Sequence, residues 1–121
     1  MEHTILLFGF DSLPEILTAQ AAAGPFGTEV RAVGPRDCGL TIGELAAGKT
    51  APEGASPVAL NGRMAVLCGL EEQMNDLLPA LRGAGVTCLK AVLTTHNRNW
   101  TPERLLAELN REHQAIERKG R

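Results

Sequence analysis

Aromatic residues are scarce in this sequence, which contains three Phe, one Trp and no Tyr. Proteins that bind single-stranded nucleic acid usually stack bases on aromatic side chains, so the composition argues against that class. It also implies a core built of Leu, Val and Ala. Basic residues are not in excess, because 12 Lys and Arg face 14 Asp and Glu and the net charge is −2. A general nucleic-acid surface therefore lacks electrostatic support.

Signals for membranes, secretion and metals are missing as well. No apolar run approaches the length that spans a bilayer. Residues 1–4 carry no basic region, and the apolar run at 5–8 is too short for the core of a signal peptide. We therefore expect a cytoplasmic protein whose cysteines are free thiols. The cysteines at positions 38, 68 and 88 show no CxxC spacing, so the sequence predicts no metal site.

An internal repeat of about sixty residues is the most informative feature that is present. Three motifs of the first half recur in the second: Gly9-Phe10-Asp11 as Gly69-Leu70-Glu71, Arg31-Ala32-Val33 as Lys90-Ala91-Val92, and Leu40-Thr41 as Trp100-Thr101. The two glycine turns lack a G-x-G-x-x-G pattern and a P-loop lysine, so no nucleotide cofactor is expected.

The repeat predicts one domain, residues 1–121, with a pseudo-two-fold core. We expect a first βαβα half at 1–48 and a second βαβα half at 64–121. Residues 49–63 contain two prolines and two glycines and have no periodic pattern. They are predicted to form a flexible linker loop, the segment of the chain most prone to disorder.

Two of the predicted strands are apolar throughout, and two alternate. Residues 5–8 and 64–68 are apolar runs, typical of strands buried on both faces. Residues 29–33 and 88–93 alternate, as strands with one wet face do. We therefore expect the first pair in the centre of a sheet and the second pair at its edges. Two βαβ units in this order favour an α+β, ferredoxin-like sheet with helices on one face. A doubly wound parallel α/β sheet is the alternative, because a short helix follows the second strand.

Capping patterns mark where the first two helices begin. Ser12 and Thr41 each precede a glutamate by three residues, which is the capping-box spacing. Leu13, Ile16, Leu17 and the alanines up to Ala23 are expected to form the apolar face of the first helix. Pro79 lies inside the third helical pattern and predicts a kink or a late start. The last helix is expected to begin after the Thr101 N-cap.

The densest polar cluster lies between the last strand and the last helix, at Thr94-Thr95-His96-Asn97-Arg98-Asn99-Trp100-Thr101. A helix N-terminus beside Arg98 and His96 could hold a phosphate or a carboxylate. The candidate ligand-binding residues are His96, Asn97, Arg98, Asn99 and, on the preceding strand, Lys90. The matching loop of the first half lacks this set, so the site would exist once.

A structural interpretation explains most of the same residues. Trp100 and Leu105 flank the Thr101 N-cap at the spacing of a hydrophobic staple. Asn97 and Asn99 can satisfy backbone groups of a turn. The sequence therefore leaves both interpretations of this loop open.

The second half also resembles a known family. The matching elements are Lys90-Ala91-Val92, Thr94, Asn97, Trp100-Thr101, Leu105-Leu106, Glu108-Leu109 and Glu112-His113, with Cys68-Gly69-Leu70 and Leu77-Leu78 upstream. Over residues 64–113 they resemble the signature of a bacterial family called domain of unknown function 3783. The resemblance implies a shared pattern at Asn97, Trp100 and Glu112-His113, and it implies no activity.

Two functional hypotheses follow. The first is a non-enzymatic module that binds a small anion or a protein partner and forms a homodimer through sheet edges or the last helix. The second is a small enzyme for a phosphorylated or carboxylate substrate, with His96 as acid or base and Arg98 as the anion clamp. No carboxylate or nucleophile lies near His96 in the sequence, so Asp11 or Asp37 of the first half would have to supply one. We therefore favour the non-enzymatic module, with neither nucleic acid nor a membrane as partner.

Overall fold

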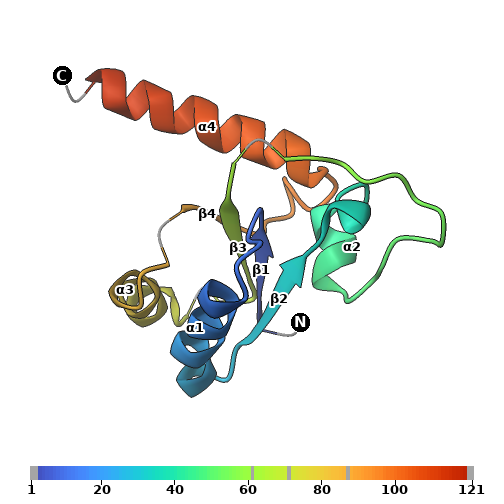
Figure 1. Cartoon of the computed structure of the whole chain (residues 1–121). Coiled ribbons are helices and arrows are strands. Elements are labelled where there is room, and N and C mark those ends of the chain that lie inside the picture. The colour runs from blue at the N-terminus through green and yellow to red at the C-terminus, as the bar shows by residue number, and fades with distance from the viewer. Residues whose placement is uncertain (1–2, 61, 71, 87, 120–121) are drawn as a thin grey trace.

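The computed structural model describes residues 3–60, 62–70, 72–86 and 88–119, with side chains up to residue 114. The chain forms a mixed sheet between two layers of helices (Figure 1). In chain order, the elements are β1 (Thr4–Phe8), α1 (Leu13–Ala23), the 3₁₀ turn η1 (Gly24–Phe26), β2 (Glu29–Val33), the 3₁₀ turn η2 (Pro35–Asp37), α2 (Ile42–Ala46), β3 (Met64–Cys68), α3 (Met74–Gly83), β4 (Leu89–Val92) and α4 (Pro102–Lys119). No helix in these residues has both the length and the apolar character needed to span a bilayer.

The sheet has the strand order β2-β1-β3-β4, which confirms the two apolar strands as central and the other two as edges. β1 pairs with β2 and β3 pairs with β4 in parallel, whereas β1 and β3 are antiparallel. In a ferredoxin-like sheet, another strand splits each βαβ unit, but here the two strands of each unit are neighbours. The fold is thus α+β without the ferredoxin-like arrangement. The antiparallel central pair also excludes the doubly wound parallel alternative.

Helices cover both faces of the sheet, so the expectation of helices on one face is wrong. α1 and α3 pack on one face, through residues such as Ala19 and Leu77. α2 and α4 pack on the other, through residues such as Ile42 and Leu105. The reason lies in the central strands, in which all five residues are buried. A strand that is apolar throughout presents side chains to both faces, and both then need a covering layer.

The two predicted capping boxes have different outcomes. Thr41 caps α2: its hydroxyl accepts from the Glu44 N–H at 3.2 Å, and the Glu44 carboxylate accepts from the Thr41 N–H at 2.9 Å. Ser12 lies at the N-cap of α1 but its side chain makes no capping bond. The predicted apolar face of α1 is correct in part: Ala19 and Ala23 are buried and Ile16 packs against the core. Leu13 and Leu17, by contrast, are 64% and 53% exposed. Apolar side chains lie on more than one side of this helix, so its sequence pattern alone does not identify which side packs against the core.

Pro79 lies within α3, which begins at Met74. The helix begins five residues before the proline and continues past it, so the expected late start is wrong. Leu77 and Leu81 are its buried residues.

The two halves share the element order βαβα and the same strand register. Thr4 pairs with Glu29 and Met64 pairs with Leu89, so each parallel pair joins residues 25 positions apart (29 − 4 and 89 − 64). The register corrects one of the aligned motifs. Arg31 lies beside Leu6, and the residue beside Val66 in the second half is Ala91 rather than Lys90. The predicted match of Arg31 with Lys90 is therefore one residue out of register.

The segment predicted as a flexible linker, 49–63, contains no helix or strand in its described part. It is nevertheless bound to the first half, because the Ala51 N–H donates to Asp37 and the Val58 N–H donates to the Pro35 carbonyl. Positions 1–2, 61, 71, 87 and 120–121 lie outside the described residues. The motif match of Asp11 with Glu71 therefore also lies outside them.

Candidate functional site

Asn97 organises the loop in which the sequence places a candidate anion site. Its side-chain oxygen accepts from the Thr94 N–H, and its amide nitrogen donates to the Val92 carbonyl, both at 2.9 Å. The Asn97 N–H donates in turn to the Thr94 hydroxyl at 3.1 Å. The residue is buried, with 8% of its surface exposed. Because both ends of the amide are engaged, Asn97 closes the turn after β4, as the structural interpretation expects.

The backbone of the same loop caps a different helix. The Arg98 carbonyl accepts from the Gly43 N–H at 2.8 Å, and the Trp100 carbonyl accepts from the Ile42 N–H at 2.9 Å. These N–H groups belong to the first turn of α2, which has no partners for them within the helix. A side chain at Gly43 would press against the Arg98 carbonyl oxygen, at 3.0 Å from its Cβ. The loop therefore joins the N-terminus of α2 to the second half.

Trp100 and Leu105, the residues of the predicted staple, lie at the start of α4. Trp100 and Leu105 both pack in the cluster between the sheet and α2 and α4. The Thr101 hydroxyl accepts from the Arg104 N–H at 3.4 Å, which is the bond of an N-cap.

The polar side chains of the loop point outward. His96, Arg98 and Asn99 are exposed. The His96 ring meets Trp100 edge-on with 5.3 Å between ring centroids, and the Arg104 guanidinium lies 4.2 Å from the centroid of the Trp100 ring. Across the described residues, His96 makes no hydrogen bond or ion pair with a carboxylate.

Lys90 is not brought to this loop. It lies beside Ala65, whose side chain faces α1 and α3, whereas Trp100 packs on the opposite face of the sheet. The Lys90 ammonium donates to the carbonyl of Cys88, just before its own strand, at 3.3 Å. The structure therefore places His96 and Arg104 against Trp100 and leaves Lys90 on the other face.

A pocket that the sequence did not reveal opens between the carboxyl ends of β1 and β2. Its volume is about 330 Å³, and it is lined by Gly9, Phe10, Asp11, Val33, Gly34, Pro35, Cys38, Val58, Ala59 and Leu60. The chain leaves β1 toward α1 on one face of the sheet and leaves β2 toward α2 on the other (Figure 1). Neighbouring parallel strands whose connections diverge in this way leave a crevice at their carboxyl ends, where open α/β sheets bind ligands.

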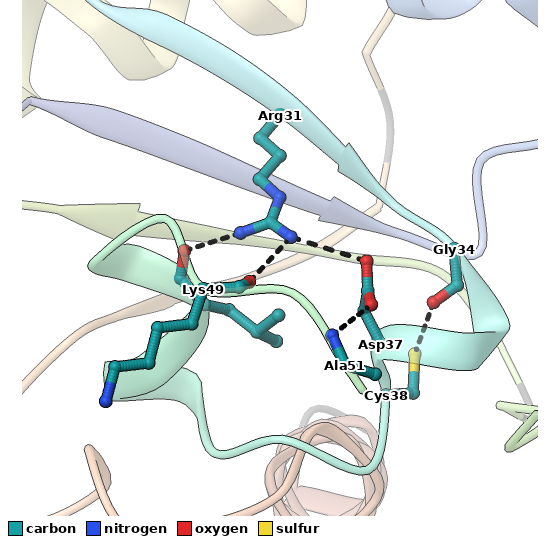
Figure 2. A network of polar contacts seen from close by, with 7 residues as sticks. Arg31, Gly34, Asp37, Cys38, Lys49 and Ala51 are labelled. Atoms are coloured by element: carbon teal, nitrogen blue, oxygen red, sulfur yellow. Dashed lines mark hydrogen bonds and ion pairs between the residues drawn. The ribbon is translucent and has the colours of Figure 1, made fainter. Parts of the chain in front are cut away.

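A second pocket of about 420 Å³ shares Gly34 and Pro35 with the first and is also lined by Arg36, Asp37 and Ala51. The residues around η2 are held by the network in Figure 2. Arg31 donates to the carbonyls of Leu45 and Lys49, each at 2.9 Å, and pairs with the Asp37 carboxylate at 3.4 Å. The other carboxylate oxygen of Asp37 accepts from the Ala51 N–H at 2.8 Å. Arg31 and Asp37 thus fix the wall shared by the two pockets.

The charged groups at the pockets are few. Asp11 lines the first pocket and Arg36 the second, and both side chains are exposed. Neither forms a hydrogen bond or an ion pair within the described residues. These two residues are therefore the ones available to a charged ligand.

Cys38 and Cys88 are not activated nucleophiles. Cys38 is buried in the pocket wall, and its thiol donates to the Gly34 carbonyl at 3.4 Å. Burial, with a smaller contribution from the Asp37 charge, raises the pKa of the Cys38 thiol. Burial also raises the pKa of Cys88, although the charges of Lys90 and Arg63 oppose the shift. Among the residues the structure describes, no three His, Cys, Asp or Glu side chains are grouped to hold a metal ion.

The signal for the pocket is present in the sequence as a glycine after each strand of the first half, at Gly9 and Gly34. Glycine at a strand end marks a turn, but it does not show which strands are neighbours. Only the sheet order places these two turns side by side.

Comparison with known proteins gives a family and no function. No curated protein and no solved structure matches the chain. A family model described as "Domain of unknown function (DUF3783)" matches residues 63–116, which confirms the resemblance predicted from residues 64–113. The residues that line the first pocket lie between positions 9 and 60, outside the matched segment. The second half of the chain, from β3 into α4, thus matches the DUF3783 family, a domain of unknown function.

Proposed function

We propose that this protein is a non-enzymatic binding module whose small-molecule ligand occupies the pocket between β1 and β2. The observation that carries the proposal is the position of the pocket at the carboxyl ends of two parallel strands whose connections diverge. Its volume of about 330 Å³ lies at the lower end of the range for small-ligand sites, about 300 to 1,000 Å³. Apolar walls with a few polar groups are also typical of such sites.

The chemistry of the lining supports binding rather than catalysis. Cys38 and Asp11 are its ionisable side chains. The Cys38 thiol is kept neutral by its raised pKa. Acid–base catalysis needs a group whose pKa lies near the working pH and which reaches the proton being transferred. His96, the candidate base of the enzyme hypothesis, is on the loop after β4 and does not line this pocket.

A single substitution can block the pocket with little effect on the fold. Gly34 has extended backbone angles, φ −80° and ψ 166°, and a Cβ at this position would meet no atom within 4 Å. Gly34→Leu should therefore fold normally and place a side chain at the wall shared by both pockets. Gly39→Leu is a matched control, because Gly39 is exposed, has the same open space around its Cβ and does not line the pocket.

The test is a thermal-shift screen of amino acids, amines, nucleosides, carboxylates and sugar phosphates. A ligand at one hundred times its dissociation constant adds about 2.7 kcal/mol to the stability of the folded state. We expect a shift with wild type and Gly39→Leu that is lost with Gly34→Leu. A shift of equal size in all three proteins would place the ligand elsewhere and refute the proposal.

A second candidate is an anion site on the loop after β4. The observation in its favour is that His96 and Arg104 flank the Trp100 ring while Arg98 has no ion-pair partner in the described chain. In this case, inorganic phosphate would raise the melting temperature of wild type and Gly34→Leu alike, and Arg98→Ala would lose the effect.

The repeat and the assembly are also part of the proposal. An internal duplication is supported by the equal register of the two parallel pairs and by Asp37 and Asn97, sixty positions apart, which each accept a bond from a backbone N–H. A homodimer through the free edges of β2 or β4 is proposed as well. Sedimentation equilibrium tests it, and a monomer at micromolar concentration would refute it.

A further inference from the structure

Asp11 is the charged residue that lines the first pocket, and it has no role in the fold that would explain its position. It lies in the turn between β1 and α1. Acidic residues beside a helix start often accept bonds from the first N–H groups, but the Asp11 carboxylate accepts none in the described chain. The carboxylate is therefore solvated and available at the pocket.

Arg63, the basic residue that contacts the neighbouring Phe10, is already engaged. The Arg63 guanidinium lies over the ring of Phe10, 4.0 Å from its centroid, and forms an ion pair with Glu15. It therefore has its own counter-charge in α1. Arg36 lines the neighbouring pocket, on the far side of the shared wall. The charge of Asp11 is thus not compensated by an ion pair in the described part of the chain.

The rest of the lining is largely apolar, and it contains no Lys, Arg or His. It is formed by the Phe10 ring, by the aliphatic side chains of Val33, Val58 and Leu60, and by Cys38. Because burial raises the pKa of the Cys38 thiol, this group is neutral as well. A carboxylate or phosphate in this pocket would face Asp11, and the cation next to the Phe10 wall, Arg63, is already paired with Glu15.

We propose that the ligand of this pocket is a small amine, with an apolar body between the walls and its ammonium group at the Asp11 carboxylate. This inference rests on the proposed function of the pocket and names the chemical class of its ligand. Burial of the apolar body supplies most of the affinity. The ion pair at an exposed carboxylate is weaker and mainly selects the charge of the ligand.

The experiment compares three probes with the same phenyl body: phenethylamine, phenethyl alcohol and 3-phenylpropanoate. Each is titrated into ¹⁵N-labelled protein at low salt, and the shifts of backbone amides report the dissociation constant and the site. We expect phenethylamine to bind about fivefold more tightly than the alcohol, which corresponds to an exposed ion pair near 1 kcal/mol. The carboxylate should bind most weakly.

Asp11→Asn keeps the size and polarity of the side chain and removes its charge. We expect this variant to bind the amine and the alcohol equally. Asp76→Asn is the matched control, because Asp76 is an exposed carboxylate on α3 that does not line the pocket. It should keep the preference for the amine, and unchanged spectra of both variants verify that they are folded.

The outcomes separate the two proposals. Suppose that the probes bind and that Gly34→Leu blocks their binding. If wild type then shows no preference for the amine, or if Asp11→Asn keeps that preference, the amine inference is overturned and the pocket proposal stands. If phenethylamine shifts no pocket amide at millimolar concentration, the amine inference also fails. If the probes bind with equal affinity to wild type and Gly34→Leu, the pocket itself is not the site, and both proposals fail.

Discussion

Gly9 provides a stability test of how closely the first glycine turn packs. Its φ of +79° is in the left-handed region, and a Cβ would collide with the backbone carbonyl of Gly62, which cannot move aside like a flexible side chain. An alanine in this conformation costs about 1 to 2 kcal/mol from backbone strain alone. The collision adds about 1 to 3 kcal/mol, as overpacking does in a core. Gly9→Ala should therefore lower the free energy of unfolding by about 3 kcal/mol.

Gly48→Ala is the control for backbone strain. Gly48 has a similar φ of +87°, but a Cβ there would meet no atom within 4 Å. This variant should lose only the strain contribution of about 1 to 2 kcal/mol. With an unfolding entropy of about 2.1 cal/mol/K per residue, the 121-residue chain melts about 4 °C lower for each kcal/mol lost. We thus expect about 12 °C for Gly9→Ala and about 4 to 8 °C for Gly48→Ala.

The assay is urea denaturation followed by circular dichroism, with melting curves as a second measurement. Equal losses in the two variants would refute the argument, because they would mean that the approach of Gly62 to the turn costs nothing. A loss for Gly48→Ala as large as that expected for Gly9→Ala would contradict the strain estimate.

The other predictions concern the hydrogen bonds of the loops and caps. Asn97→Ala leaves a backbone N–H and a carbonyl of the turn unpaired and should lower the free energy of unfolding by about 2 to 3 kcal/mol, measured by urea denaturation. A variant as stable as wild type would contradict this prediction. Arg31→Met removes the donors to two backbone carbonyls and should lower the free energy of unfolding by about 2 kcal/mol. Hydrogen exchange at the Ala51 amide should become faster, and unchanged protection of this amide would show that Arg31 does not hold Asp37 in place. Thr41→Ala should cost about 1 kcal/mol, whereas Ser12→Ala, which has no capping bond to lose, should be neutral in melting temperature. The backbone N–H of Thr41, followed by its hydroxyl, lowers the pKa of Glu44, so this stabilisation is complete above the carboxyl pKa of the unfolded chain and is lost as pH falls through the lowered value. A Glu44→Gln variant whose stability shows the same acid dependence as wild type would contradict that assignment.

The hydrophobic pattern of the sequence was sufficient to predict the strands and which of them are central in the sheet. The runs at Thr4–Phe8 and Met64–Cys68 are buried at every position and form the centre of the sheet. Their apolar character also required cover on two faces, which the ferredoxin-like prediction did not provide. The sequence could not predict whether neighbouring strands run parallel or antiparallel, because a buried strand has the same apolar pattern in both cases.

Local sequence patterns predicted local structure correctly where all the hydrogen bonds of the motif form within the same few residues. The Thr41–Glu44 box forms within four residues of chain and is present as predicted. At Ser12, the same spacing fails to form the bond, and Glu15 instead pairs with Arg63, a residue distant in sequence. A tertiary ion pair with such a partner cannot be inferred from capping spacing.

The sequence also identified only one of the two candidate sites. The sequence identified the loop after β4 by its polar residues, and the structure shows Asn97 and the loop carbonyls bound to backbone groups. The pocket at Gly9 and Gly34 was missed because its walls come from three segments that only the fold brings together.

By itself, the sequence determined the apolar strands and their places in the sheet, the cap at Thr41, and the family resemblance of the second half. These features depend on composition and on spacings of a few residues, where sterics and hydrogen bonding act directly. Only the tertiary structure decided the antiparallel contact of β1 with β3, the helix layers on both faces and the pocket between the ends of β1 and β2. These features depend on contacts between residues far apart in the chain, whose free energies depend on the packing of the whole domain.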